Sequence, residues 1–247
     1  MLNGKKVLLI ITGGIAAYKS LELVRKLKEK GADVIPVMTK AAENFVTPMS
    51  VSALAQEKVY NKLFDLTDEA EMGHIELSRS SDLIVVVPAS ADFIAKTATG
   101  QANDLASTLI LATDTKVLMA PAMNVRMWEN PITQKNIKIL HNNGVKFVGP
   151  DEGEMACGEF GFGRMAEADE ILKEIEANFR DKKLKGRHFL VTSGPTIEPI
   201  DPVRFIGNRS SGLQGEAIAN ELVESGAEVT FITGPVDLDP PHGSNII

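Results

Sequence analysis

The sequence predicts an α/β protein with a doubly wound parallel sheet of Rossmann-like type, followed by an incomplete second β-α-β unit. The opening segment is the first reason. Residues 5–12 form an apolar β-rich run, residues 16–31 an amphipathic helical pattern, and residues 32–39 a further strand. The strands are also short and continuously apolar, which is typical of parallel sheets covered on both faces. Finally, the same β-α-β pattern returns from residue 187 onward.

Three more buried strands are predicted at residues 82–90, 116–123 and 145–150, with a helix over 132–144 between the last two. A charged helical pattern then leads into a basic connector. We therefore expect a first domain over residues 1–180, a linker over 181–186 and a second part over 187–247. About 60 residues are too few for a complete doubly wound domain. The second part is thus expected to be a fragment of a larger domain.

Composition narrows the class of protein. Hydrophobic residues make up 44% and charged residues 24%, which suits a soluble core, and the net charge is −7. An acidic chain lacks the basic face that nucleic acids and anionic membranes require, so neither is expected as a partner. A single cysteine allows no intrachain disulfide, and the chain shows no signal-peptide pattern or long apolar run. We expect a cytoplasmic protein.

Several predicted strands end in small or polar residues, and ligands of open α/β sheets bind at such carboxyl ends. Gly13 and Gly14 follow the first strand, where they suit either a tight turn or an anion held at a helix N-terminus. The second strand ends in Thr39 and Lys40 instead of an acidic residue, which disfavours a dinucleotide site. After the third strand, residues 90–92 suit either a ribityl chain or ordinary helix capping.

Three further side chains are candidates for chemistry. His74 suits a general base, although a lone histidine is more often structural or solvated. Asn124 lies between two methionines, where its amide suits either a ligand carboxylate or an Asx-turn. Cys157 lies in the glycine-rich segment 153–165, which predicts an irregular flap with glycine hinges. Its thiol is then either a proton donor brought to a ligand or an inert side chain.

Taken in order, these segments resemble one family, and the resemblance covers essentially the whole chain. The segments are "GGIAAYK", "GHIELSR", "PASADFIAK", "ATGQANDLAST", "PAMNVRMW" and "ACGEFGFGRM", with "SGPTIEPIDPVRFIGNRSSG" in the second part. They are similar to the homo-oligomeric flavin-containing cysteine decarboxylases. Within these, the resemblance is to the bifunctional flavoproteins of coenzyme A biosynthesis, which join phosphopantothenoylcysteine decarboxylase to phosphopantothenate-cysteine ligase.

The resemblance implies FMN at the carboxyl ends of the strands and no metal in the first domain. The implied flavin contacts are Gly13, Gly14, Ile15, Thr39, Lys40, Ser90, Ala91, Asp92 and Ala122. It also implies roles for three side chains: His74 as the base, Asn124 as the binder of the substrate carboxylate and Cys157 as the flap acid. Asn208 matches a catalytic position of the ligase half, which in complete form uses CTP and a divalent metal such as Mg²⁺. We expect no ligase turnover from this chain.

The implied reaction converts 4'-phospho-N-pantothenoylcysteine to 4'-phosphopantetheine and CO2. Oxidation of the substrate thiol by the flavin creates a group that takes up the electron pair left on carbon when CO2 departs. The cofactor therefore supplies the difficult step. The resemblance also implies a homo-oligomer, either a trimer or a dodecamer. Two alternatives stay open: a peptidyl-cysteine decarboxylase, and a non-catalytic flavin-binding regulatory subunit.

Overall fold

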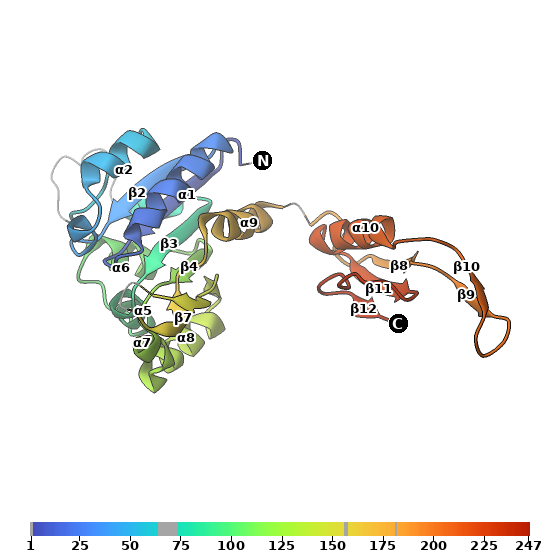
Figure 1. Ribbon diagram of the computed structural model, residues 1–247. Coiled ribbons are helices and arrows are strands. Elements are labelled where there is room, and N and C mark those ends of the chain that lie inside the picture. Colours follow the sequence, from blue (N-terminus) through green and yellow to red (C-terminus); the bar gives the residue numbers. More distant parts are fainter. Residues whose placement is uncertain (1, 64–73, 156–157, 181) are drawn as a thin grey trace. The chain divides into compact units, whose positions relative to one another are not determined.

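The chain folds into two units, seen in a computed structural model that describes residues 2–63, 74–155, 158–180 and 182–247. The first unit is Met1–Glu176 and the second is Ala177–Ile247. A parallel sheet forms the centre of the first unit, and a smaller sheet forms the centre of the second (Figure 1). The predicted α/β class is confirmed.

The sheet of the first unit has five strands in the order β2-β1-β3-β4-β5, and every neighbouring pair is parallel. The strands are β1 (Lys6–Ile11), β2 (Asp33–Met38), β3 (Leu83–Ala89), β4 (Val117–Pro121) and β5 (Lys146–Phe147). From β1 the chain moves outward to β2, and from β3 it moves outward in the opposite direction. The switch point therefore lies between β1 and β3, where open sheets bind ligands.

Helices cover both faces of this sheet (Figure 1). One apolar cluster joins Leu8 of β1 and Ile84 of β3 to Phe93 and Leu109 on the covering helices. The helical segments are α1 (Ala17–Glu29), η1 (Ala42–Asn44), α2 (Pro48–Ala55), α4 (His74–Arg79), α5 (Ala91–Ala98), α6 (Leu105–Leu111), α7 (Val125–Glu129), α8 (Pro131–Asn142) and α9 (Ala168–Phe179). Within the described ranges, no helix is both long and apolar enough to cross a membrane.

Ion pairs hold α1 and α9 together on one face of the sheet. Lys26 Nζ lies 2.7 Å from Asp169 Oδ1, and Lys30 Nζ lies 3.0 Å from Glu176 Oε1. Below this charged layer α9 buries Ile171. The apolar side of α9 thus completes the covering of the sheet, while its acidic side faces the basic residues of α1.

On either side of residues 156–157, which are not described, the glycine-rich segment forms a regular two-stranded ribbon, so the prediction of irregular structure is wrong for these strands. Strands β6 (Asp151–Glu154) and β7 (Phe160–Arg164) pair in antiparallel fashion. Gly163 has φ +139°, and a Cβ there would lie 2.3 Å from the carbonyl oxygen of Met123. The glycine is therefore needed for close packing onto the segment after β4, where Met123 N donates to Gly163 O at 3.0 Å. Cys157 lies outside the described residues.

The second unit contains the predicted β-α-β arrangement and one short extra strand. Its sheet has the order β12-β11-β8, all parallel, with α10 between β8 and β11 along the chain. A small core of Ala219, Val229 and Phe231 lies between helix and sheet. The elements are β8 (His188–Ser193), α10 (Leu213–Glu224), β11 (Glu228–Thr233) and β12 (Asn245–Ile246).

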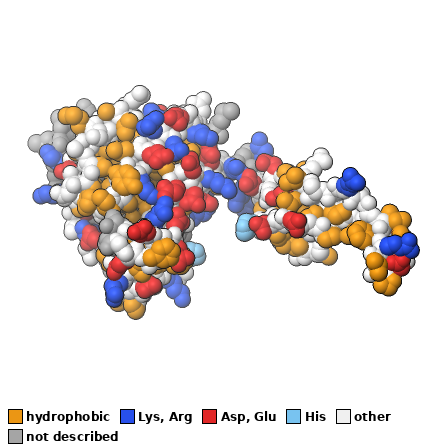
Figure 2. All heavy atoms as spheres, viewed as in Figure 1, with side chains coloured by type: hydrophobic (Ala, Val, Ile, Leu, Met, Phe, Trp, Pro, Cys, Tyr) orange, Lys and Arg blue, Asp and Glu red, His pale blue; other side chains and the backbone are white. Residues whose placement is uncertain are grey.

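A separate antiparallel ribbon in the second unit presents apolar side chains to solvent. It consists of β9 (Ile197–Pro199) and β10 (Phe205–Gly207). Val203 in the turn is 87% exposed and Ile206 is 64% exposed. Hydrophobic side chains are prominent over this ribbon in Figure 2. An exposed apolar surface of this kind marks a contact region.

Candidate functional site

A cavity of about 540 Å³ opens at the carboxyl edge of the parallel sheet. Its walls come from the segments after β1 and β4, from the β6–β7 ribbon and from the approach to α9. The lining residues are Gly14, Ile15, Ala16, Tyr18, Lys19, Ala122, Met123, Asn124, Glu154, Met155, Gly163, Arg164, Met165 and Glu167. The cavity thus lies at the edge where the strand pattern predicted a ligand.

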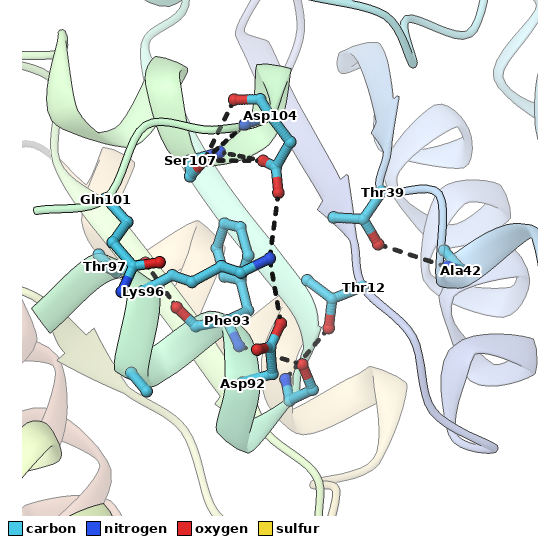
Figure 3. Close-up of polar contacts among 12 residues, drawn as sticks. Thr12, Thr39, Ala42, Asp92, Phe93, Lys96, Thr97, Gln101, Asp104 and Ser107 are labelled. Atoms are coloured by element: carbon cyan, nitrogen blue, oxygen red, sulfur yellow. Dashed lines mark hydrogen bonds and ion pairs between the residues drawn. The ribbon is translucent and has the colours of Figure 1, made fainter. Parts of the chain in front are cut away.

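Thr12 joins the two strands at the switch point. Its hydroxyl donates to the carbonyl oxygen of Pro88 at 2.7 Å and accepts a hydrogen bond from Ser90 N at 3.1 Å. The side chain is 1% exposed, so both bonds are shielded from water. Figure 3 shows Thr12 beside Asp92 and Phe93 at the start of α5. The ends of β1 and β3 are therefore held in one geometry by a residue that we had not predicted as a site residue.

The two glycines after β1 differ in what their environment requires. A Cβ on Gly13 would lie 2.5 Å from Ala41 Cβ, so packing between two loops demands glycine there. A Cβ on Gly14 would meet no protein atom within 4 Å. The loop leads into α1, which has no side-chain cap and no acidic residue in its first turn. An uncapped helix N-terminus beside an open cavity fits the phosphate of a flavin.

The hydroxyl groups that follow β2 and β3 serve as caps. Thr39 Oγ1 accepts from Ala42 N at 3.3 Å, and Ser90 Oγ accepts from Phe93 N at 3.3 Å (Figure 3). Ser90 thus takes the capping role that was one of its two alternatives, and Thr39 forms a similar cap; contact of either residue with a flavin stays a prediction. Of the predicted flavin contacts, Gly14, Ile15 and Ala122 line the cavity. The others follow the strand ends without lining it: Gly13, Thr39, Lys40, Ser90, Ala91 and Asp92.

Asp92 takes part in a charged cluster that links α5 to the start of α6. Lys96 Nζ lies 3.3 Å from Asp92 Oδ2 and 3.5 Å from Asp104 Oδ2 (Figure 3). Partial burial alone would lower the pKa of Lys96, but these carboxylates raise it above its ordinary value. Asp104 also caps α6 in a capping box with Ser107. The cluster therefore fixes two helix starts.

Asn124 has the capping role that was one of its two predicted alternatives, and binding of a ligand carboxylate stays a prediction. It is the N-cap of α7, where its Oδ1 accepts from Met127 N at 3.0 Å. Its Nδ2 donates at 2.6 Å to a carboxylate, that of Glu159. Because the cap engages the amide oxygen, the NH2 group is directed away from the helix. The side chain is thus both an Asx-type cap and a carboxylate-binding group at the cavity wall.

One wall of the cavity carries a shared ion pair. Lys19 Nζ donates to Glu167 Oε1 at 2.8 Å, and Arg164 also contacts this oxygen. The hydrogen bond from Lys19, and then that from Arg164, lower the pKa of the Glu167 carboxyl below its usual range. The three side chains join α1, β7 and the start of α9. They fix the base of the ribbon that packs against Asn124.

The other predicted catalytic residues have no described side chain in the first unit. The backbone of His74 begins α4, while its side chain and all of Cys157 lie outside what the structure describes. Asn208 belongs to the second unit, where its Nδ2 donates to Thr196 Oγ1 at 3.2 Å. Over the described part of the chain, no group of three or more His, Cys, Asp or Glu side chains is placed to hold a metal ion.

Two family models match the two parts of the chain. The family model described as Flavoprotein matches residues 1–180. The model of the DNA/pantothenate metabolism flavoprotein C-terminal domain matches residues 184–247. The coenzyme A biosynthesis bifunctional protein CoaBC of Vibrio vulnificus (strain YJ016) is 50% identical over 246 residues, which is 100% of this chain and 61% of that protein. The chain therefore spans about three fifths of this curated relative.

The chain is similar to solved structures that cover about seven tenths of its length. A cysteine-to-serine mutant of PPC decarboxylase, complexed with pantothenoylaminoethenethiol, superposes with a TM-score of 0.65 at 30% identity. The match covers 72% of this chain and 99% of that one. The FMN-binding protein AtHal3 gives a TM-score of 0.61 at 31% identity, covering 70% of this chain and 96% of its own.

Proposed function

We infer the activity from one premise: this chain belongs to the flavoprotein family, whose model matches residues 1–180. We propose that it decarboxylates 4'-phospho-N-pantothenoylcysteine to 4'-phosphopantetheine and CO2 with FMN as cofactor, within coenzyme A biosynthesis. The observation that carries the proposal is the position of Asn124, which lines a cavity at the sheet's carboxyl edge and whose amide donates to the carboxylate of Glu159. The similarity to PPC decarboxylase and to an FMN-binding protein supports it.

The residues around the cavity fit a flavin mononucleotide. The open space at Gly14 and the uncapped start of α1 suit its phosphate, and Ala122 leaves room for its ring system. When bound, FMN supplies a reversible two-electron oxidation of the substrate thiol. The protein's own part is to orient the substrate through Asn124 and to exclude water with the β6–β7 ribbon. We keep His74 as the proposed base and Cys157 as the proposed acid.

A Gly14→Ala substitution is expected to weaken FMN binding at least tenfold and to leave the Tm of the flavin-free protein within about 2 °C of the wild type. The added methyl would meet no protein atom, so only a ligand in the cavity would be displaced. Flavin fluorescence titration gives the Kd, and calorimetry gives the Tm. Gly13→Ala is the contrasting variant, because its methyl would clash with Ala41 and lower the Tm without any ligand. Unchanged FMN affinity in the Gly14 variant would place the flavin elsewhere.

We also propose a homo-oligomer, a trimer or a dodecamer. Large hydrophobic side chains are exposed at the cavity lining and on strand β7, which supports burial of these surfaces against another copy. They are Ile15 at 63%, Tyr18 at 58%, Phe160 at 71% and Phe162 at 50%. Light scattering after size exclusion measures the assembly's mass, and a monomer would contradict this part of the proposal.

For the second unit we propose the first part of a phosphopantothenate-cysteine ligase domain, with residues 1–180 as the decarboxylase domain and residues 181–186 as the linker. The match to the pantothenate metabolism C-terminal model supports this. A cavity of about 180 Å³ lies at the carboxyl ends of β8 and β11, beside Ser193 and Gly212. In this proposal CTP and Mg²⁺ belong to the complete ligase domain, with Asn208 among its catalytic residues.

A further inference from the structure

The carboxylate of Glu159 is held by two groups from the start of α7. Asn124 Nδ2 donates to Glu159 Oε2 at 2.6 Å, and Arg126 Nε lies 3.5 Å from Glu159 Oε1. Each carboxylate oxygen thus faces a different donor. Glu159 directly precedes β7, and Asn124 follows β4, so residues 35 positions apart meet at this point. The pair of donors is a ready-made carboxylate site.

The cap on α7 makes this site selective for an anion. The amide oxygen of Asn124 is engaged by Met127 N, so the amide can present only N–H donors to a ligand. Arg126 adds a permanent positive charge. Neither group offers an acceptor, so an ammonium group, which can only donate, finds no partner here. A carboxylate satisfies both donors at once.

Asn124 is the carboxylate binder that the resemblance implies, and we propose that Arg126 assists it and that Glu159 occupies this position until the substrate displaces it. The inference rests on the proposed decarboxylation. The N–H of Asn124 that donates to Glu159 cannot serve a second carboxylate at the same time, and two carboxylates so close repel each other, so Glu159 and the substrate compete for this position. Glu159 is therefore an internal competitor, and Arg126 is a binding residue that the resemblance did not assign.

With an internal competitor, the apparent Kd equals the intrinsic Kd divided by the fraction of time that the site is open. If Glu159 held the site about nine-tenths of the time, its removal would lower the apparent Kd for a carboxylate ligand about tenfold. A ligand of the same shape without a carboxylate does not compete with Glu159. The ratio of the two Kd values therefore isolates this effect from any general change in the cavity.

The experiment uses the FMN-loaded protein and two unreactive ligands without a thiol. One is the alanine analogue of the substrate, 4'-phosphopantothenoyl-alanine, which keeps the carboxylate. The other is 4'-phosphopantothenoyl-ethylamine, which lacks it. We expect Glu159→Gln and Glu159→Ala to lower the Kd of the alanine analogue roughly 3- to 10-fold and to leave that of the ethylamine unchanged. Arg126→Met should raise only the Kd of the alanine analogue, by about tenfold.

Lys135→Met on α8 is the matched control for loss of an exposed positive charge. It should leave both Kd values unchanged. If the wild type binds both ligands but the Glu159 variants do not tighten the alanine analogue selectively, Glu159 is no competitor and the inference is wrong. An equal effect of Arg126→Met on both ligands would also overturn it. If the wild type binds neither ligand, the proposed function itself fails and the inference fails with it.

Discussion

An Asn124→Asp enzyme is expected to fold and bind FMN but to lose more than 99% of its decarboxylase activity. Aspartate is as good an N-cap as asparagine, so its carboxylate should still accept from Met127 N and hold α7. It replaces a donor with a negative charge facing the substrate carboxylate. A lost hydrogen bond to a charged group and the added repulsion together correspond to about a hundredfold or more in kcat/KM. CO2 release under steady-state conditions measures this.

Asn130→Asp provides the matched control. Asn130 caps α8 through Oδ1, which accepts from Ile132 N at 2.9 Å, and it does not line the cavity. The same substitution there should leave kcat/KM within about twofold of the wild type. If the two variants had similar activity, Asn124 would be a structural cap alone, and the proposed carboxylate site would be lost.

Gly163→Ala is expected to be the most destabilising single substitution that we propose. Its methyl would lie 2.3 Å from Met123 O on a backbone with φ +139°, so the ribbon could not remain against the segment that carries Asn124. We expect a loss of about 3 kcal/mol in unfolding free energy, which is roughly 6–12 °C in Tm. Decarboxylation should fall at least tenfold, because Asn124 would be misplaced. Calorimetry and the CO2 assay measure the two effects.

Gly144→Ala separates backbone strain from the clash. Gly144 has φ +88°, and a Cβ there would meet no atom within 4 Å. It should therefore lose only about 1 kcal/mol and keep its activity. Equal losses in the two variants would show that strain alone explains the effect and that the ribbon does not need close packing at Gly163.

The strand pattern predicted the architecture because the strands of a parallel sheet that is buried on both faces are continuously apolar in sequence. Continuous apolar runs such as residues 83–89 indicate cover on both faces, and a cavity lies at the sheet edge where these strands end. Side-chain roles at that edge were harder to predict. Thr39 and Ser90 were predicted as flavin contacts; their hydroxyls cap backbone N–H groups, and contact with a flavin stays a prediction. A short polar side chain suits either role, and sequence alone does not separate them.

Contacts between residues far apart in the chain could not be predicted from the sequence. Nothing local to Glu159 indicates that it meets Asn124, because the contact depends on how the β6–β7 ribbon packs. The ribbon itself was predicted as an irregular flap, since glycine density suggests disorder unless the packing partner is known. Gly163 shows that the partner is the backbone at Met123. The roles of His74 and Cys157 stay predictions.

The central claim is that this chain removes CO2 from a phosphorylated cysteinyl substrate. The most direct test incubates the purified FMN-loaded protein with 4'-phospho-N-pantothenoylcysteine and follows CO2 and organic product together by mass spectrometry. Equimolar CO2 and 4'-phosphopantetheine, formed over many turnovers without loss of FMN, are the predicted result. An FMN-loaded protein that binds the substrate and returns it unchanged would contradict the account, and would point to a flavin-binding protein without this activity.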